Sequence, residues 1–101
     1  MLDKERPALV VSNNIRNEAA QHITVAAIRS NPKAALIPEC FAVKASRANG
    51  LSHDSAADCG HLFTLDKSAF TKLLGRIEPI YLKILDRAIA VSMGLSFYPH
   101  P

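Results

Sequence analysis

The side chains that could do chemistry in this chain are dispersed rather than gathered in a recognisable motif. The sequence contains no GxSxG nucleophile elbow, no phosphate-binding P-loop and no HExxH zinc-binding pair. Imidazole groups, which can transfer protons near neutral pH, occur at four separate positions: His22, His53, His61 and His100. Taken alone, each is more typical of a structural or exposed residue than of a catalytic one. Local motifs therefore identify no reaction.

The two cysteines also lack the spacing of a reactive or metal-binding pair. Cys40 and Cys59 form no CxxC motif, and no histidine is placed to complete a metal site with them. We expect both to be buried, reduced thiols. The sequence therefore predicts neither a metal site nor a cofactor.

Charge indicates a class of partner but not a site. The formal net charge is +3 and the pI is near 9.1, which favours an anionic partner, either a nucleic acid or an acidic protein segment. The basic residues are not clustered, so charge alone does not establish nucleic-acid binding. Arg6 stands out because it precedes Pro7 and an apolar run, residues 8–11. It is either the solvated flank of a strand or a functional residue.

Length and composition predict a single soluble domain over residues 1–101. Hydrophobic residues make up 49% and charged residues 21%, as in ordinary globular proteins. The longest apolar runs are far shorter than the roughly 20 residues of a membrane span. The N-terminal stretch MLDKERPALVV carries charges where a signal peptide would have a long apolar segment. We therefore expect a cytoplasmic protein without a membrane segment.

The elements that must position these residues are mostly strands. The first two predicted strands should pair as a hairpin around the polar stretch 13–21, and Pro38 suits an edge or a bulge of the third. Asn49-Gly50, within the predicted loop 45–54, is the strongest turn signal. Four stretches have the composition of strands: residues 7–12, 22–28, 34–43 and 55–65.

The C-terminal third adds helices. Asp66 is a suitable N-cap for a short helix over 67–70, and residues 71–77 are predicted to return as a short extended segment. Residues 79–93 should form an amphipathic helix, with Pro79 at its first position and Gly94 at its C-cap. Lys83, Asp86 and Arg87 form its polar face, and its apolar residues recur every three or four positions: Tyr81, Ile84, Leu85, Ala88, Val91 and Leu95.

Strands followed by one such helix predict a mainly β or α+β domain, a small antiparallel barrel or curled sheet with the helix packed against it. The order of four blocks points further. RPALVVSNN, ITVAAI, GLSHDSAADCGHLFTLDKS and LLGRIEP, the last leading into a helix that ends in MGL, resemble the MazF/PemK family of bacterial toxin ribonucleases. The resemblance covers about residues 5–95. It implies an SH3-like (CcdB/PemK-like) barrel with a C-terminal helix, working as a homodimer.

The resemblance also implies an activity and partners. Such a toxin cleaves single-stranded mRNA without a metal, through attack of the ribose 2′-OH on the adjacent phosphate, and an acidic antitoxin neutralises it. Arg6 matches the family's catalytic Arg, whose guanidinium can hold two phosphate oxygens and stabilise developing charge. Arg29 occupies the position of the family's catalytic Thr, and Ser30 follows it. The candidate catalytic residues are therefore Arg6, Arg29 and Ser30.

Further polar residues are expected to contact RNA. His61 lies where the family often has an RNA-reading residue, although a structural histidine is equally consistent, and Gly60 replaces an acidic neighbour common there. The remaining candidates are positions that could line an RNA path: Asn13, Asn14, Arg16, Lys33 and Lys44.

Two departures from the family leave other functions open. Family members begin with a further strand and a glycine-containing loop, which residues 1–5 are too short to contain, so the outer edge of the first strand is expected to be unpaired. Arg29 also lacks the hydroxyl of the Thr it replaces. A catalytically impaired relic, or a non-catalytic antitoxin-binding module of the same fold, is therefore the second hypothesis. A gyrase poison is a third, disfavoured by the absence of Trp and by the tail SFYPHP.

Overall fold

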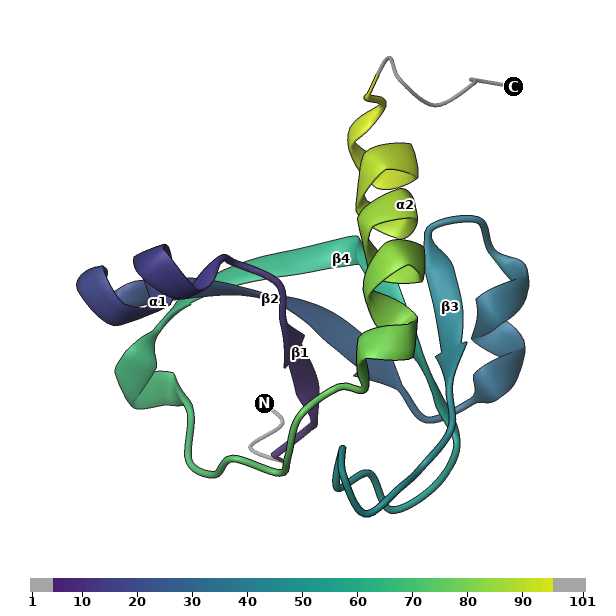
Figure 1. Cartoon of the computed structure of the whole chain (residues 1–101), viewed down its shortest axis with the longest axis horizontal. Helices are drawn as coiled ribbons and strands as arrows, with labels where there is room; N and C mark the ends of the chain where they lie inside the picture. Colours follow the sequence, from purple (N-terminus) through teal and green to yellow (C-terminus); the bar gives the residue numbers. More distant parts are fainter. Residues whose placement is uncertain (1–4, 96–101) are drawn as a thin grey trace.

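A four-stranded antiparallel sheet with one long helix against it forms the protein (Figure 1). The structure is a computed structural model and describes residues 5–95. The first four residues and the segment SFYPHP, with His100, lie outside the described residues. The elements, in which η marks a short 3-10 helix, are in chain order: β1 (Ala8–Val10), α1 (Asn14–Ala19), β2 (His22–Arg29), η1 (Pro32–Leu36), β3 (Cys40–Val43), β4 (Ser55–Asp66), η2 (Lys67–Ala69), η3 (Pro79–Tyr81) and α2 (Leu82–Met93).

The strands lie in the order β1-β2-β4-β3, and all neighbours are antiparallel. The predicted hairpin of the first two strands is confirmed, and β1 lies at one edge of the sheet, as expected. β1 and β3 do not pair, so within residues 5–95 the sheet is curled into a half-barrel rather than closed. The predicted architecture of an antiparallel sheet with a C-terminal helix is confirmed.

One β-bulge interrupts the central strand pair. Ala26 pairs with Leu62, but the next residue of β2, Ala27, pairs with Asp58. Residues 59–61 of β4 therefore have no pairing partner in β2, where Ala26 and Ala27 are consecutive. A bulge of this kind bends its strand and redirects side chains. Here it brings residues on either side of the bulge toward one another.

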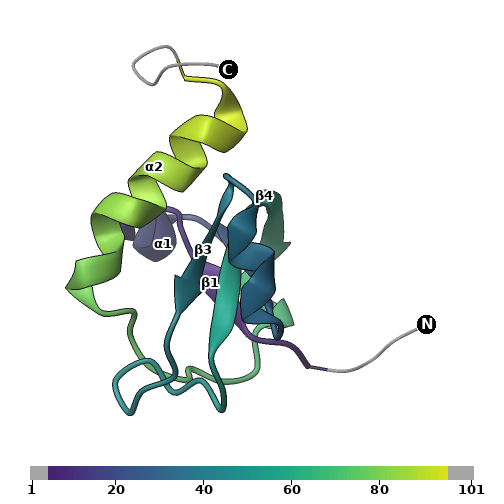
Figure 2. The same ribbon diagram turned by 90° about the vertical axis from the view of Figure 1, so that its right-hand side faces the viewer.

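The two faces of the sheet carry different layers. Successive side chains of a strand point to opposite faces. The helix α2 packs on one face, and Figure 2 shows η1 on the other side of the sheet. Cys59 belongs to the core, and Cys40 is also buried; both are free thiols, as predicted. The core under α2 consists of small and medium apolar side chains: Ala26, Phe41, Val43, Ala57, Cys59, Leu85 and Ala88.

The helix α2 follows the predicted pattern with two exceptions. Pro79 is the first residue of η3, which leads into α2, and Gly94 ends the helix with φ +66°. Leu85 and Ala88 face the core, and the residues predicted to be polar-facing are exposed. Ile84 and Leu95 are predicted on the apolar face but are exposed, because neither packs against the core that Leu85 and Ala88 join. No helix within residues 5–95 is long and apolar enough to cross a membrane.

A predicted loop and the first part of a predicted strand contain short helices instead. Within the polar stretch 13–21, α1 forms because the side chain of Asn13 accepts a hydrogen bond from the backbone N–H of Arg16 and so caps it. In the predicted strand 34–43, η1 replaces the first part, and only Cys40–Val43 is a strand. Asn31 caps η1 and Pro32 begins it, which is the usual place for proline in a helix.

The segments after β4 are partly as predicted. The side chain of Asp66 accepts a hydrogen bond from Ser68, so the predicted N-cap is confirmed, although the helix is the single turn η2. Residues 71–77 form no strand, contrary to the prediction. The backbone N–H of Arg76 instead donates to the carbonyl of Ala48, in the loop before β4. The segment is therefore held by a loop rather than by the sheet.

The loop 45–54 is organised by the buried side chain of Asn49. Its Oδ1 accepts from the backbone N–H groups of Ser46 and Leu51, and its Nδ2 donates to Lys44 O and to Glu78 Oε1. The next residue, Gly50, has φ +71°, and a Cβ there would lie 2.1 Å from the carbonyl oxygen of residue 74. The Asn49-Gly50 signal is therefore confirmed as a turn that joins two loops.

Replacing Asn49 should destabilise the fold more than replacing an exposed polar residue nearby. Asn49→Ala removes four hydrogen bonds of a buried side chain and leaves partners that are mostly half-buried unpaired, which should lower the free energy of unfolding by about 2–4 kcal/mol. Urea unfolding followed by circular dichroism measures the loss. Ser52→Ala, in the same loop but exposed, is the control and should change little. Equal losses in the two variants would contradict the role of Asn49.

Candidate active site

Arg29, Asp58 and His61 form a side-chain cluster at the β-bulge. Arg29 is the last residue of β2; in β4, Asp58 directly precedes the bulge and His61 is its last residue. Arg29 Nε lies 2.6 Å from Asp58 Oδ2, and His61 Nδ1 lies 2.8 Å from the same oxygen. The Asp58 side chain is only 6% exposed, whereas those of Arg29 and His61 are 44% and 55% exposed. A buried carboxylate thus carries two half-exposed groups that can act as cations or donors.

The carboxylate of Asp58 fixes how the imidazole of His61 is protonated. An ionised carboxylate only accepts hydrogen bonds, so Nδ1 must carry the proton that it donates to Asp58. Arg29 Nη2 lies 3.1 Å from Nδ1 and 3.5 Å from Nε2. Nδ1 cannot also accept from Arg29, so that approach is a packing contact of the guanidinium on the ring. In the neutral tautomer, Nε2 is left as a proton acceptor.

Several donors keep Asp58 ionised although it is buried. Burial is the largest single influence and raises its pKa, but hydrogen bonds from Arg29, Cys40, Gly60 and His61 together bring the pKa of Asp58 below its usual value. The backbone N–H of Gly60 donates to Oδ1 at 2.9 Å. Burial, together with this carboxylate, raises the pKa of the Cys40 thiol to about 11, so the thiol stays protonated and donates.

Arg6 shares this end of the sheet by strand register. It is exposed and lies two residues before β1. Ala8 pairs with Ala27, so β1 begins beside the end of β2 at which Arg29 lies, and Arg6 precedes this pair by two residues. Because side chains alternate along a strand and paired residues share a face, Arg29 belongs to the face that also carries Asp58. Two arginines thus lie near the same end of the β1–β2 pair.

The other predicted catalytic and RNA-binding residues are less closely placed. Ser30 is exposed and follows β2 directly, so it neighbours Arg29 without a hydrogen bond in the described part of the chain. Lys33 is an exposed residue of η1, where its backbone N–H bonds to Asn31. Lys44 follows β3 and is exposed, and its backbone N–H donates to the hydroxyl of Tyr81. None of the three belongs to the Arg29–Asp58–His61 cluster.

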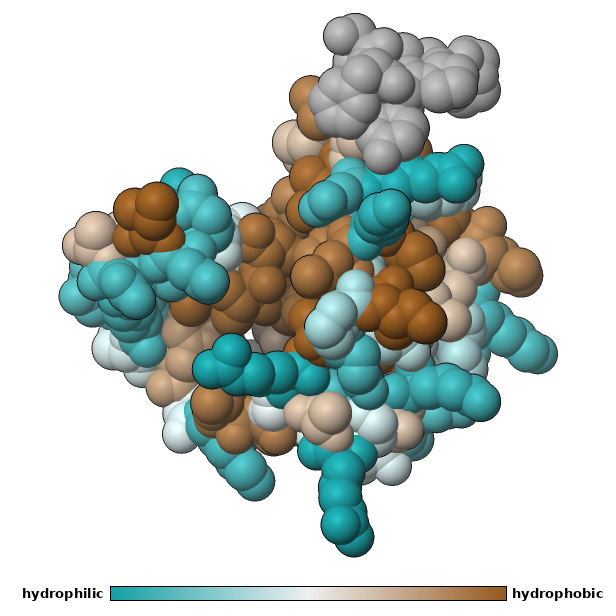
Figure 3. Space-filling model, in the orientation of Figure 1, coloured by the Kyte–Doolittle hydropathy of each residue, from teal (hydrophilic) through white to brown (hydrophobic). Residues whose placement is uncertain are grey.

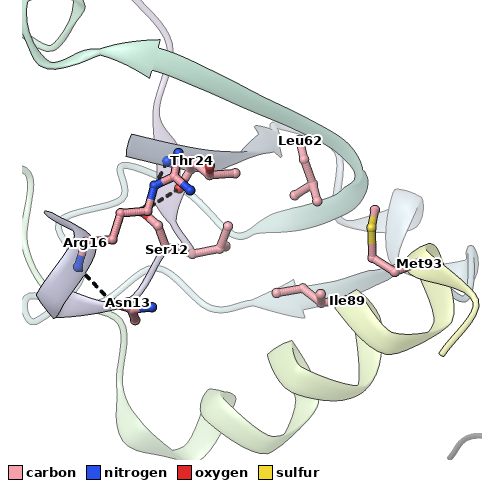
Figure 4. Close-up of a pocket in the computed structure, with 8 residues that line it drawn as sticks. Ser12, Asn13, Arg16, Thr24, Leu62, Ile89 and Met93 are labelled. Atoms are coloured by element: carbon pink, nitrogen blue, oxygen red, sulfur yellow. Dashed lines mark hydrogen bonds between the residues drawn. The ribbon is translucent and has the colours of Figure 1, made fainter. Parts of the chain in front are cut away.

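The predicted RNA contacts at α1 lie at the opposite end of the β1–β2 hairpin. Asn13 caps α1, and Asn14 is its exposed first residue. Asn13 and Arg16 line a pocket of about 370 Å³ between α1 and α2, visible as an apolar hollow in Figure 3 and enlarged in Figure 4. The pocket lies on the α2 side of the sheet, away from Arg29. Its other lining residues are mostly apolar: Val11, Ser12, Thr24, Leu62, Ile89 and Met93.

Asp58 is the residue that sequence reasoning missed. It was included in a predicted half-buried strand without a role of its own. The sequence did carry a signal, since Asp58 interrupts the run Ala56-Ala57-Asp58-Cys59. A carboxylate within an otherwise apolar strand must find a partner if it is buried. In the same part of the chain, residues 5–95, no three His, Cys, Asp or Glu side chains are grouped as metal ligands would be.

The cluster can provide positive charge together with a proton acceptor. Two arginines suit a phosphate group, because guanidinium donors match phosphate oxygens in a bidentate way. An imidazole whose other nitrogen is bound by a carboxylate is a common arrangement of a general base. The geometry therefore suits chemistry at a phosphate more than binding of a neutral ligand.

The depressed pKa of Asp58 should make the fold sensitive to acid. A carboxylate whose folded pKa lies below its ordinary value of 3.8 stabilises the folded state above that pH, and the contribution is lost as the pH falls through the folded pKa. We expect Asp58→Asn to be less stable than the parent by about 1–3 kcal/mol near pH 7, with the gap shrinking below pH 3.8. Urea unfolding between pH 7 and about pH 3 measures it. Asp86→Asn, on the exposed face of α2, is the control; a gap for Asp58→Asn that is constant with pH would contradict the assignment.

Known proteins share this architecture. The curated protein Endoribonuclease EndoA of Bacillus subtilis (strain 168) is 29% identical over 90 residues, which cover 89% of this chain and 77% of that protein. A solved mycobacterial endoribonuclease in complex with its cognate antitoxin is 26% identical, with a TM-score of 0.77 over 95% of this chain and 84% of that one. The Mycobacterium tuberculosis toxin MazF-mt6, at 24% identity, matches the fold with a TM-score of 0.82 over 94% of this chain and 92% of that one.

A family model matches nearly the whole chain. The family is described as PemK-like, MazF-like toxin of type II toxin-antitoxin system, and its model matches residues 2–93. The matched region includes both arginines, the bulge and α2. The family predicted from the order of the four sequence blocks is therefore confirmed. This chain belongs to the PemK-like, MazF-like toxins of type II toxin-antitoxin systems.

Proposed function

We propose that this chain is a toxin that cleaves single-stranded RNA as an endoribonuclease. The observation that carries the proposal is the cluster of Arg29, Asp58 and His61 at the end of the β1–β2 pair near which Arg6 also lies. Membership of the toxin family supports it, as do the relatives named as endoribonucleases. Messenger RNA in the bacterial cytoplasm is the substrate that this family membership suggests.

The two arginines differ in how they can serve a phosphate. Within residues 5–95, no carboxylate forms an ion pair with Arg6, so its guanidinium is available to hold two phosphate oxygens. Arg29 is directed by Asp58 through Nε and is limited to its terminal nitrogens. In the proposed reaction the 2′-OH attacks the adjacent phosphorus, and a cyclic phosphate and a free 5′-OH are formed. Arg6 and Arg29 stabilise the charge on the phosphorane.

A second function has an observation of its own. The ion pair with Asp58 partly neutralises Arg29, at the position where the family resemblance places a catalytic hydroxyl. A chain that keeps the fold but cleaves RNA poorly or not at all would serve as an antitoxin-binding module. The cleavage experiment below separates this function from that of an enzyme.

The proposed partners are an acidic antitoxin and a second copy of the chain. One solved relative is an endoribonuclease in complex with its cognate antitoxin, and the net charge of +3 suits an acidic segment. Large apolar side chains are unusually exposed for a monomer of this size. The most exposed are more than three-quarters accessible: Ile15, Leu36, Leu73 and Ile80.

Removing the guanidinium of Arg6 should abolish cleavage without unfolding the protein. Arg6 is exposed and outside the core, so Arg6→Ala should retain the stability of the parent. The rate on a mixed-sequence single-stranded RNA, with EDTA present, should fall about 10²–10³-fold, the usual cost of losing one group that stabilises transition-state charge. Arg87→Ala, on the exposed face of α2, is the matched control and should cleave normally.

The outcomes of this assay separate the two functions. Cleavage by the parent that leaves cyclic phosphate ends and is lost in Arg6→Ala supports the enzyme. An unchanged rate in Arg6→Ala removes Arg6 from the mechanism. A folded parent chain that cleaves no RNA but binds an antitoxin supports the non-catalytic module.

The chain should form a homodimer in solution. Burial of the exposed apolar side chains between two copies would supply the driving force. Size-exclusion chromatography with light scattering should give about twice the 11.0 kDa of one chain. A monomer mass at all accessible concentrations would remove the dimer from the proposal.

A further inference from the structure

We propose that His61 is the general base of RNA cleavage in this chain and that Asp58 is its positioning residue. The inference rests on the proposed ribonuclease function and assigns the proton transfer that this function requires. From the sequence, His61 is expected to be either an RNA-reading residue or a structural one. Its hydrogen bond to Asp58 in the structure supports a role in proton transfer instead.

The first support is the orientation of the imidazole. Asp58 Oδ2 accepts the Nδ1 proton at 2.8 Å, which sets the ring and leaves Nε2 as the basic nitrogen of the neutral form. The two nitrogens are on different sides of the ring, so a group bound at Nδ1 does not block Nε2. The His61 side chain is 55% exposed, and a bound RNA can therefore reach it.

The second support is that Asp58 does not need His61 as a structural partner. Arg29 already neutralises its charge at 2.6 Å, and Gly60 and Cys40 supply two further donors. A half-exposed histidine adds little to the stability of a carboxylate that is satisfied in this way, because ordering an exposed side chain offsets a surface contact. The main effect of the contact is that Asp58 holds the His61 ring in one orientation.

The third support is the backbone beneath the cluster. The bulge at residues 59–61 allows His61 to return toward Asp58, three residues earlier in the same strand. A Cβ at Gly60 would lie 3.1 Å from Asp58 Oδ1 and 3.4 Å from Glu39 Oε2. Any larger residue at position 60 would crowd the carboxylate. The glycine and the bulge are thus compatible with the approach of His61 to Asp58.

The fourth support is the position of His61 beside the proposed phosphate-binding groups. Its ring nitrogens lie within 3.5 Å of Arg29 Nη2, and Arg6 lies two residues before Ala8, which pairs with Ala27 near the Arg29 end of β2. A phosphate held by the arginines would bring the adjacent ribose within reach of the imidazole. Because the guanidinium of Arg29 is already protonated and has no acceptor site, Arg29 cannot take the 2′-OH proton, and the base must be another residue.

The proposed step balances without any co-reactant. Nε2 of His61 takes the proton of the 2′-OH while the bond from 2′-O to phosphorus forms. The bond from phosphorus to the leaving 5′-oxygen breaks, and that oxygen takes a proton from water. The imidazolium then returns its proton to solvent, so the net products are a 2′,3′-cyclic phosphate and a free 5′-OH.

The decisive test is chemical rescue of a histidine variant. His61→Ala should lower the single-turnover cleavage rate about 10²–10³-fold, within the range for loss of a general base, while the Kd for RNA changes little. Added imidazole should restore much of the rate, since it can occupy the vacated space and accept the proton. Asp58→Asn should reduce the rate by a smaller factor that imidazole does not restore.

Two controls accompany this measurement. His53→Ala removes an exposed histidine in the loop before β4, and it should cleave like the parent with or without imidazole. His61→Gln keeps a polar side chain of similar length, and it should be as inactive as the alanine variant. The unfolding midpoints of both His61 variants should match the parent, which excludes misfolding as the cause of any loss.

Each result has a defined meaning. A parent that cleaves RNA together with a fully active His61→Ala would overturn the assignment and leave the ribonuclease function intact. A His61→Ala variant that binds RNA weakly and is not restored by imidazole would also overturn it, and would make His61 an RNA-binding residue. A folded parent without cleavage would overturn the ribonuclease function itself, and the assignment with it.

Discussion

The buried carboxylate of Asp58 is the constraint on which one end of the sheet depends. A charge in that position is unfavourable unless it is paired and hydrogen-bonded. Arg29, Gly60 and Cys40 meet this requirement from three directions, through β2, the bulge and β3. The three residues therefore hold fixed positions because each donates a hydrogen bond to the Asp58 carboxylate. A functional site needs side chains in fixed positions, and here the fold itself provides them.

The residues that were predicted to contact RNA lie on two different surfaces of the sheet. Arg29 and His61 contact Asp58 on the face opposite α2, whereas the apolar pocket near Arg16 lies on the α2 side. Alternation of side chains along a strand makes this division, because a residue and its neighbour must face opposite ways. The polar stretch that was expected to line a path for RNA instead folds into α1, at the far end of the hairpin. Phosphate chemistry and apolar contacts are thus assigned to different parts of the surface.

The resemblance to the family predicts a threonine where this chain has Arg29, and such a replacement would change what this end of the sheet must provide. An arginine adds charge and removes a hydroxyl, and its ion pair with Asp58 anchors it. His61 reaches the same carboxylate only because three residues of β4 bulge away from β2. The substitution and the bulge are then parts of one arrangement. Charge stabilisation and proton transfer are divided between side chains from two strands.

The sequence by itself determined the elements whose signals are local, together with the family. The apolar runs of β1 and β2, the cap at Asp66 and the amphipathic α2 ending at Gly94 follow from spacing and turn residues. Only the tertiary structure decided the partners of Asp58, because the register shift between β2 and β4 depends on pairing across the sheet and has no local sequence signature. The short helices α1 and η1 are a different case, because the caps at Asn13 and Asn31 are local signals that the sequence itself contains. Contacts between distant segments depend on which arrangement of the whole chain best buries apolar groups and satisfies hydrogen bonds. A short stretch of sequence does not carry that information.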